Sequence, residues 1–458
     1  MGIATINPAT GETLKTFEPA SDVEVQTAIG RAHGAWKSYR NTSFAQRSAW
    51  MRASAELLDA ESEDVARLMT TEMGKTVASA RAEVAKCVRA LDYFSNHAEQ
   101  LLADELVDAS SVGAARAYAR YESLGPTLAV MPWNFPLWQV IRFAAPALMA
   151  ANVVLLKHSS NVPQTAMYIE NLFARSGFPD GCFQTLLITA AQVEPVLRDS
   201  RIAAATLTGS EPAGRSVAAI CGDEIKRTVL ELGGSDPFLV MPSATLDQAV
   251  DAAVTSRIQN NGQTCIAAKR FIVHTDVYDA FTAAFVSKME ALRVGDPLDP
   301  ETQIGPLATD QNRNDVDALV RDATELGAQV LCGGRPRDGR GWFYPPTVLA
   351  GITPQMRLYA EEAFGPVATV FRVNDIDEAI EIANATPFGL GSNAWTSEAS
   401  EQQRFIKELE AGQVFVNGIT GSYNELPFGG TKRSGYGREL SAHGIREFCN
   451  LKTVWIGA

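Results

Sequence analysis

The sequence lacks a long apolar run, a basic tract and a secretory leader, and each absence excludes a class of protein. The most apolar stretch, from Phe143 to Leu156, is broken by Pro146 and Asn152 and is shorter than the ~20 residues that span a bilayer. A net charge of −13 without a basic run argues against nucleic acid or an anionic membrane as the main partner. The start Met-Gly-Ile-Ala-Thr has neither the basic segment nor the apolar core of a signal peptide.

Paired cysteines are also absent. The six cysteines are scattered, none forms a C-x-x-C pair, and none lies near a histidine at the spacing of metal ligands. The sequence therefore predicts no disulfide framework and no metal site. Reduced thiols fit the cytoplasm, where we expect the protein to be located.

The chain is long enough for more than one hydrophobic core. Its 458 residues predict two or three domains, and its 46% hydrophobic and 20% charged residues are ordinary for a globular protein. Apolar residues recur at helical spacing through much of 22–105. The alternation at 116–121 favours an edge strand or arm, and that at 448–456 favours a strand paired outside its own domain.

From residue 125 onward, short apolar strands alternate with helical segments. This pattern indicates a parallel sheet with crossover helices, and a second α/β block follows from about 235 to 430. Ligands of such sheets bind at the carboxyl ends of the strands. The residues at those ends are polar or small: Trp133 and Asn134, Lys157 to Ser160, Gly209 and Ser210, and Glu231.

The most informative pair of residues is Cys265 and Glu231. Cys265 follows small and polar residues in Asn-Asn-Gly-Gln-Thr-Cys, and Glu231 ends an apolar strand pattern before two glycines. A cysteine is a nucleophile as its thiolate, and a nearby carboxylate can act as a base on it or on water. Taken alone, Cys265 is more often a small buried apolar residue, and Glu231 a solvated loop residue.

Other strand ends offer groups that suit an oxyanion or a nucleotide. Asn134 lies in the turn Pro-Trp-Asn-Phe-Pro, where two prolines fix the backbone and the amide could donate to an oxyanion. Lys157 with His158, Ser159 and Ser160 supplies a cation and hydroxyls for ribose or phosphate. Each of these also has an ordinary reading, as a turn residue or a solvated loop.

The usual signatures of nucleotide binding are missing. Gly209 and Ser210 open a helix after a strand, which favours anions, but G-x-G-x-x-G follows no predicted strand. The run 73–76, Met-Gly-Lys-Thr, looks like the end of a P-loop. Met69 stands where the first glycine should be and no strand precedes the run, so we reject this motif. Adjacent Glu361 and Glu362 point apart and do not predict a carboxylate pair.

Taken together and in order, these motifs resemble the aldehyde dehydrogenase superfamily over nearly the whole chain. The matching segments are Pro-Trp-Asn-Phe-Pro (132–136), Lys157, Gly209-Ser210, Glu-Leu-Gly-Gly (231–234), Gly-Gln-Thr-Cys (262–265), Glu-Glu-Ala-Phe-Gly-Pro (361–366) and Pro-Phe-Gly-Gly-Thr-Lys-Arg-Ser-Gly (427–435). The resemblance implies an α/β fold with a Rossmann-like parallel-sheet cofactor domain (1–105 and 124–234), an α/β catalytic domain (235–435) and a small β oligomerisation arm (106–123 and 436–458).

The resemblance also implies roles for individual residues. Cys265 would add to an aldehyde to give a thiohemiacetal, whose oxyanion the Asn134 side chain and the Cys265 backbone N–H would hold. Hydride transfer to the nicotinamide would leave a thioester, and Glu231 would activate the water that hydrolyses it. The cofactor contacts implied are Trp133, Asn134, Lys157, His158, Ser159, Ser160, Gly209, Ser210, Leu232, Glu362 and Phe364.

Within the superfamily the chain is most similar to bacterial succinate-semialdehyde dehydrogenases, which oxidise succinate semialdehyde irreversibly to succinate. Arg142 matches an arginine that this subclass uses for the substrate carboxylate, and Ser422 could add a hydroxyl donor. Many members carry a second arginine six residues before the nucleophile, where this chain has Gln259. A glutamine can bond a carboxylate but cannot neutralise it, which puts strict dicarboxylate selectivity in question.

The resemblance bears on cofactor choice and assembly as well. NAD-selective relatives often carry a glutamate where Ser160 stands, which repels a 2′-phosphate. We therefore expect NADP to be accepted and preferred, with NAD possible. A homodimer or homotetramer is implied.

Three other functions stay open at this point. The chain could oxidise another aliphatic or ω-carboxy aldehyde with NAD(P). It could hydrolyse thioesters or esters without redox chemistry, although hydrolysis needs no cofactor-side residues. It could also be a catalytically silent relative, although such a protein needs none of Asn134, Glu231 and Cys265.

Overall fold

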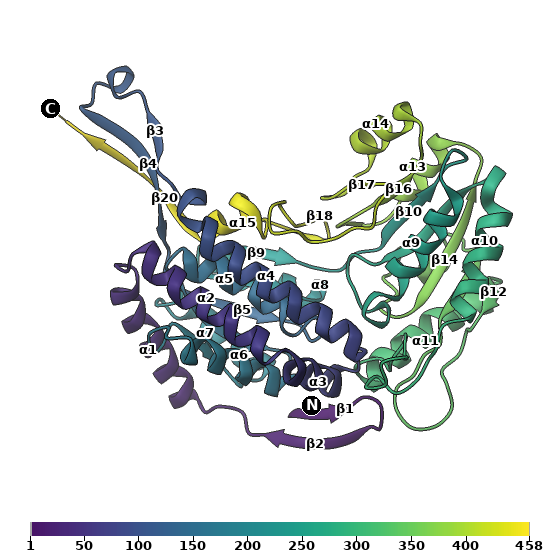
Figure 1. Ribbon diagram of the computed structural model, residues 1–458, viewed down its shortest axis with the longest axis horizontal. Coiled ribbons are helices and arrows are strands. Elements are labelled where there is room, and N and C mark those ends of the chain that lie inside the picture. Colours follow the sequence, from purple (N-terminus) through teal and green to yellow (C-terminus); the bar gives the residue numbers. More distant parts are fainter. Residues whose placement is uncertain (1, 458) are drawn as a thin grey trace.

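The computed structural model describes residues 2–457, which form two sheet-based units and a projecting arm (Figure 1). The first sheet has six strands in the order β19-β9-β8-β5-β6-β7, all parallel except β19. Their bounds are β5 Pro126–Met131, β6 Val153–His158, β7 Phe183–Thr185, β8 Ala204–Thr208, β9 Arg227–Glu231 and β19 Gly435–Tyr436. These parallel pairings confirm the predicted sheet with crossover helices. Its strands are apolar because both faces of the sheet are covered.

Helices connect these strands and surround the sheet. They are α5 Trp138–Met149, α6 Pro163–Arg175, α7 Val193–Arg198 and α8 Glu211–Asp223, together with α1 Asp22–Tyr39, α2 Phe44–Ala60, α3 Ser62–Met73 and α4 Val77–Leu101 from the N-terminal region. The four N-terminal helices confirm the helical prediction for 22–105. The antiparallel hairpin before them, β1 Ile3–Asn7 and β2 Glu12–Phe17, was not predicted.

The second sheet has seven strands in the order β12-β13-β14-β11-β10-β16-β17. Their bounds are β10 Asp236–Val240, β11 Ala268–His274, β12 Gln329–Cys332, β13 Thr347–Ala350, β14 Val367–Val373, β16 Asn393–Trp395 and β17 Phe415–Val416. Its main helices are α9 Leu246–Ile258, α10 Thr275–Glu290, α11 Asp310–Glu325, α12 Arg357–Ala360, α13 Ile376–Asn384 and α14 Ala399–Glu408. The short pair β15 Phe388–Gly389 and β18 Thr431–Lys432 leads the chain back toward β9.

The arm consists of β3 Glu105–Val107, β4 Arg116–Ser123 and β20 Cys449–Ile456, which project from the body (Figure 1). β20 pairs antiparallel with β4 over its whole length, as the alternation at 448–456 predicts. Not all of 436–458 belongs to this arm. β19 pairs with β9, and α15 Ser441–Glu447 packs on α4 and α5, so these residues lie on the first unit.

Within residues 2–457, no helix has both the length and the apolar character needed to cross a membrane.

The rejected motif at 73–76 has a structural role. Gly74 ends α3 in a left-handed conformation. Lys75 is fully buried, lies over the Phe135 ring and forms an ion pair with buried Glu83. Glu83 also accepts hydrogen bonds from the backbone N–H groups of Leu137 and Trp138, at 2.9 and 2.8 Å. This network fixes the start of α5, which carries Arg142 and follows the turn with Asn134.

Replacing Glu83 with alanine should destabilise the fold by about 3–5 kcal/mol, because it leaves the Lys75 ammonium buried without a partner. Denaturant unfolding measures the change. The double variant Lys75→Met/Glu83→Gln should recover much of the loss, since neither charge is then buried. A cost for Glu83→Ala below about 1 kcal/mol would contradict this role of the ion pair.

Candidate active site

The loop that carries Cys265 has an unusual backbone. Asn260, Asn261 and Gly262 have positive φ angles of 55°, 58° and 77° in succession after α9 ends. Asparagine and glycine adopt this conformation most readily, which explains the Asn-Asn-Gly sequence. A Cβ on Gly262 would lie 2.3 Å from the Gly365 carbonyl carbon, so the loop packs directly against the segment after Glu362.

Side-chain amides hold this loop in place across the two units. Asn261 donates to the carbonyls of Gly74 and Pro306, at 2.9 and 3.0 Å. Asn260 donates to the Asn134 carbonyl at 2.6 Å and to the Gln263 carbonyl at 3.1 Å. The loop is therefore tied to the turn that carries Asn134, so the positions of Asn134 and Cys265 depend on each other.

Cys265 lies where two cavities meet. One has a volume of about 300 Å³ and the other about 640 Å³, and Cys265 lines both. Gln139 on α5 is also common to the two linings. A nucleophile at this junction can contact a small substrate on one side and a larger ligand on the other.

The surroundings of Cys265 set its protonation. Burial raises the pKa of the thiol to about 12, and the positive charges of Lys269 and Arg142 oppose that rise. Lys269 donates to the Thr264 carbonyl at 2.8 Å and to the Cys265 carbonyl, and its Nζ lies 3.0 Å from Glu362 Oε1. Lys269 therefore orients the loop that carries Cys265 and favours the thiolate.

Asn134 is 4% exposed and faces the same loop. Its Nδ2 donates to the Gln263 carbonyl at 3.1 Å, which leaves the second N–H of the amide free. Asn134 also lines the larger cavity beside Cys265. The structure thus brings the predicted oxyanion donor next to the predicted nucleophile.

Glu231, at the end of β9, is 2% exposed, and its Oε1 has no hydrogen-bond partner among the described residues. Burial and the neighbouring carboxyl of Glu439 raise its pKa well above the usual value, while Arg142 and Arg438 oppose that rise. A buried carboxyl with a raised pKa is a stronger base once it is ionised, which suits the activation of water.

The larger cavity contains most of the predicted cofactor residues. Seven of the eleven are in its lining: Trp133, Asn134, Gly209, Ser210, Leu232, Glu362 and Phe364. Gly209 and Ser210 lie at the N-terminus of α8, where Ser210 makes no side-chain cap, so backbone N–H groups stay available to an anion. A Cβ on Gly233 would lie 2.6 Å from Glu362 Oε2, and one on Gly234 would lie 2.7 Å from the Cys265 carbonyl oxygen, which shows why two glycines follow Leu232.

Lys157, His158, Ser159 and Ser160 lie at the end of β6 and are not in the described lining of that cavity. His158 is buried under the Asn134 turn. Its Nδ1 accepts from the Ser159 N–H at 2.9 Å, and its Nε2 lies 2.8 Å from the Pro136 carbonyl. Burial lowers the pKa of His158 to about 4, so the ring is neutral. These contacts give His158 a role in fixing the 132–136 turn.

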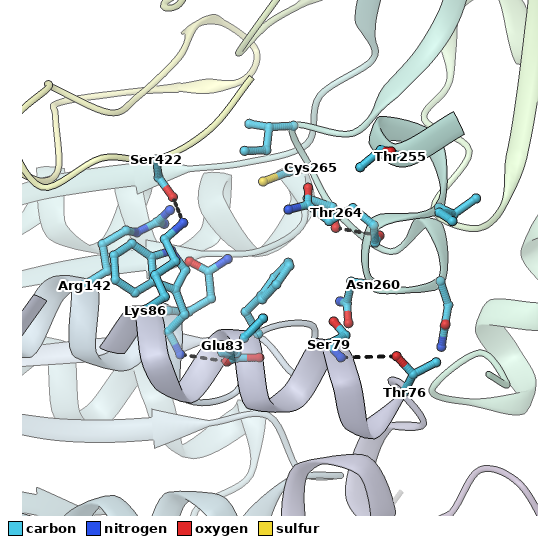
Figure 2. A pocket seen from close by; sticks show the side chains of 18 of the residues that line it. Thr76, Ser79, Glu83, Lys86, Arg142, Thr255, Asn260, Thr264, Cys265 and Ser422 are labelled. Carbon is cyan, nitrogen blue, oxygen red and sulfur yellow. Dashed lines mark hydrogen bonds between the residues drawn. The ribbon is translucent and has the colours of Figure 1, made fainter. Parts of the chain in front are cut away.

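The smaller cavity contains the predicted substrate residues Arg142, Gln259 and Ser422. The Arg142 side chain is 2% exposed and forms a buried ion pair with Glu439, and its guanidinium lies 4.5 Å from the Phe428 ring centroid. Lys86, from α4, lines the same cavity and bonds the Ser422 hydroxyl (Figure 2).

Three residues of this site were not identified from the sequence. Lys269 is a charged residue at the start of a buried strand, and this mismatch could have marked it. Glu439 had been assigned to the arm, yet it lies beside Glu231 because β19 returns the chain to the first sheet. Lys86 lies in an amphipathic helix, where a lysine is usually solvated, so no local signal singled it out.

Comparison with known proteins identifies the family. The model of the "Aldehyde dehydrogenase family" matches residues 1–454. A "Succinate-semialdehyde dehydrogenase [NADP(+)]" of Mycolicibacterium paratuberculosis is 67% identical over 459 residues, which cover 100% of this chain and 97% of the relative. One from Mycobacterium tuberculosis, "Succinate-semialdehyde dehydrogenase [NADP(+)] 1", is 67% identical over 456 residues, with 100% of both chains covered.

Solved structures show the same fold. The succinic semialdehyde dehydrogenase of Streptococcus pyogenes, in complex with NADP+, has a TM-score of 0.97 and 36% identity, with 100% of both chains covered. The succinate-semialdehyde dehydrogenase of Burkholderia pseudomallei has a TM-score of 0.96 and 33% identity, covering 100% of this chain and 95% of that one. The family model over residues 1–454 and the 67% identical relatives show that this chain, with Cys265 at the junction of its two cavities, belongs to the aldehyde dehydrogenase family.

Proposed function

We propose that the protein oxidises succinate semialdehyde to succinate with NADP+ as the acceptor. The observation that carries the proposal is the place of Cys265 at the junction of the two cavities. The smaller cavity presents the cations Lys86 and Arg142 with the Ser422 hydroxyl, which suit a carboxylate. The 67% identical relatives, named as succinate-semialdehyde dehydrogenases that use NADP(+), support the same substrate and cofactor.

The residues of the chain divide the chemistry between them. The Cys265 thiolate adds to the carbonyl carbon to form a thiohemiacetal, and the Asn134 amide and the Cys265 backbone N–H donate to the oxyanion. NADP+, when bound, would supply the acceptor for the hydride, and Cys265 would then hold the acyl group as a thioester. Glu231 removes a proton from water as the water attacks the thioester, and the carbon–sulfur bond breaks to release succinate and the thiol.

The larger cavity fits a dinucleotide phosphate. Its uncapped α8 N-terminus suits the pyrophosphate, and Trp133, Leu232, Glu362 and Phe364 line the rest. At the end of β6, the half-buried Lys157 supplies a positive charge near Ser160. Neither residue repels a 2′-phosphate, which favours NADP over NAD.

Steady-state kcat/KM for succinate semialdehyde and for butyraldehyde, each with NADP+ and with NAD+, tests the proposal. We expect the semialdehyde to lead by roughly a hundredfold or more, about 2.7 kcal/mol, with NADP+ as the better acceptor. Ser160→Glu should lower kcat/KM for NADP+ by about tenfold or more while NAD+ is less affected. Equal rates for the two aldehydes would reduce the function to that of a general aldehyde dehydrogenase.

We also propose that the arm joins copies of the chain into a homodimer or homotetramer. Its strands and the turn between β3 and β4 expose large apolar side chains that the body does not cover: Leu106, Val107, Val112, Leu451, Trp455 and Ile456. Surfaces of this kind mark protein contacts. A molar mass in solution equal to the 49.3 kDa of one chain would refute this assembly.

The six cysteines are free thiols, which supports a reducing location such as the cytoplasm.

A further inference from the structure

Lys86 is a largely buried cation that has no carboxylate partner. Among the ion pairs of residues 2–457, none includes Lys86, although its side chain lies inside the smaller cavity. The nearest acid on its own helix, Glu83, is already paired with Lys75 and bonded to two backbone N–H groups. A buried ammonium without a counter-ion is costly, and such a group is a natural binding site for an anion.

The contacts of Lys86 direct it into the cavity. Its Nζ lies 4.3 Å from the centroid of the Trp138 ring and donates to the Ser422 hydroxyl oxygen. Because that oxygen accepts from Lys86, the hydroxyl proton is free to donate to a ligand. Figure 2 shows Lys86, Arg142 and Ser422 converging at one end of the cavity, with Cys265 farther along it.

Arg142 differs from Lys86 because acidic groups already surround it. It is paired with Glu439 and lies close enough to Glu231 to affect its pKa. The charge of Arg142 is therefore already balanced in part by Glu439 and Glu231, before any substrate binds. The residue six positions before Cys265 is Gln259, which brings no charge. Lys86 is thus the cation of this cavity that a substrate carboxylate can neutralise.

We propose that Lys86 is a specificity-determining residue, whose ammonium, together with the Ser422 hydroxyl, binds the carboxylate of the ω-carboxy aldehyde and sets its aldehyde carbon toward Cys265. This inference rests on the proposed function and names the group that makes the reaction selective for an ω-carboxy aldehyde. It also accounts for the glutamine at 259, because the second positive charge comes from α4 instead of from the catalytic loop.

The test compares kcat/KM for succinate semialdehyde and butyraldehyde in the wild type, Lys86→Met and Lys86→Arg. In Lys86→Met the preference for the semialdehyde should fall by about ten- to a hundredfold, mainly through KM, because the carboxylate contact is the same in ground and transition states. Lys86→Arg should restore part of it. Arg89→Met, which removes an exposed positive charge three residues along α4, should leave the preference unchanged.

The outcomes separate the two proposals. If the wild type shows no preference for the semialdehyde, both the substrate assignment and the role of Lys86 are overturned. If the wild type shows the preference and Lys86→Met keeps it, only the role of Lys86 is overturned.

A pH profile of the unmodified protein gives a second readout that does not depend on a variant folding. Burial, and then repulsion by Arg142, lower the pKa of Lys86 to about 8, against the opposing effects of Cys87 and Glu83. The other charged or titratable groups around Lys86 line a second, adjoining cavity to which Lys86 also contributes. They are Arg89 on α4, Asp92 and Tyr93 one turn further, and Glu425.

The ammonium form binds the carboxylate, so KM for the semialdehyde should rise as pH increases through about 8, by up to roughly tenfold per pH unit. KM for butyraldehyde should not follow it. In Lys86→Arg the rise should move to higher pH. A semialdehyde KM that stays flat relative to butyraldehyde between pH 7 and 10 would overturn the proposal.

Discussion

Serine in place of Cys265 is expected to lower the rate of NADPH formation by about a thousandfold or more, about 4 kcal/mol. The two side chains are nearly the same size, so the loop should keep its shape. Burial already raises the pKa of the thiol to about 12, and a serine hydroxyl at the same place is far harder to ionise. The charges of Lys269 and Arg142 can favour a thiolate, but they are too weak to offset the much higher pKa of a serine hydroxyl.

The measurement is the absorbance of reduced nicotinamide with succinate semialdehyde as substrate. Cys332→Ser, at a buried cysteine on the edge strand β12, is the matched control and should retain activity. Turnover that survives in Cys265→Ser would show that another group is the nucleophile. Nicotinamide reduction also distinguishes the dehydrogenase from a hydrolase, which would consume a thioester without producing NADPH.

Replacing Glu231 with glutamine should separate hydride transfer from hydrolysis. A stopped-flow burst of about one NADPH per Cys265 should remain, and the steady-state rate that follows should fall by about 10²- to 10⁴-fold. The amide has the shape of the carboxyl but cannot accept a proton from water, so the thioester accumulates. Glu408→Gln, at a surface glutamate paired with Arg404, is the control and should leave both phases unchanged. Loss of the burst itself would show that Glu231 is required at or before hydride transfer, and not only for hydrolysis of the thioester.

The wild-type rate of the hydrolytic phase should rise with pH. Burial and Glu439 raise the pKa of Glu231, so the ionised form that acts as base becomes more populated as pH increases. Arg142 opposes that rise in pKa. Arg142→Met should therefore move the increase in rate to higher pH, measured with butyraldehyde to keep carboxylate binding out of the comparison.

Local patterns in the sequence were enough for much of the fold. The helices at 22–105, the alternating strands and helices after 125 and the strand at 448–456 were all predicted and confirmed. The hairpin β1-β2 was missed because its exposed second strand has no apolar alternation. In the second block the sequence predicts strands near 271–273, 329–331, 367–371 and 414–416, but not β10, β13 and β16, because short buried strands lack a distinctive period.

The sequence by itself determined the chemical groups at the strand ends and the backbone that presents them. Cys265, Glu231 and Asn134 are fixed by local features: a strand end, a turn between prolines, and the Asn-Asn-Gly run that tolerates positive φ. Only the tertiary structure decided which charged and polar side chains meet. Lys86 with Ser422 and Arg142 with Glu439 are each joined across about three hundred residues. Such pairings depend on how the two sheets and α4 pack, and burial then makes them strong, because charges removed from water must find partners. The proposed selectivity for the substrate is therefore a property of the packed molecule, whereas the proposed nucleophile and its base can be read along the chain.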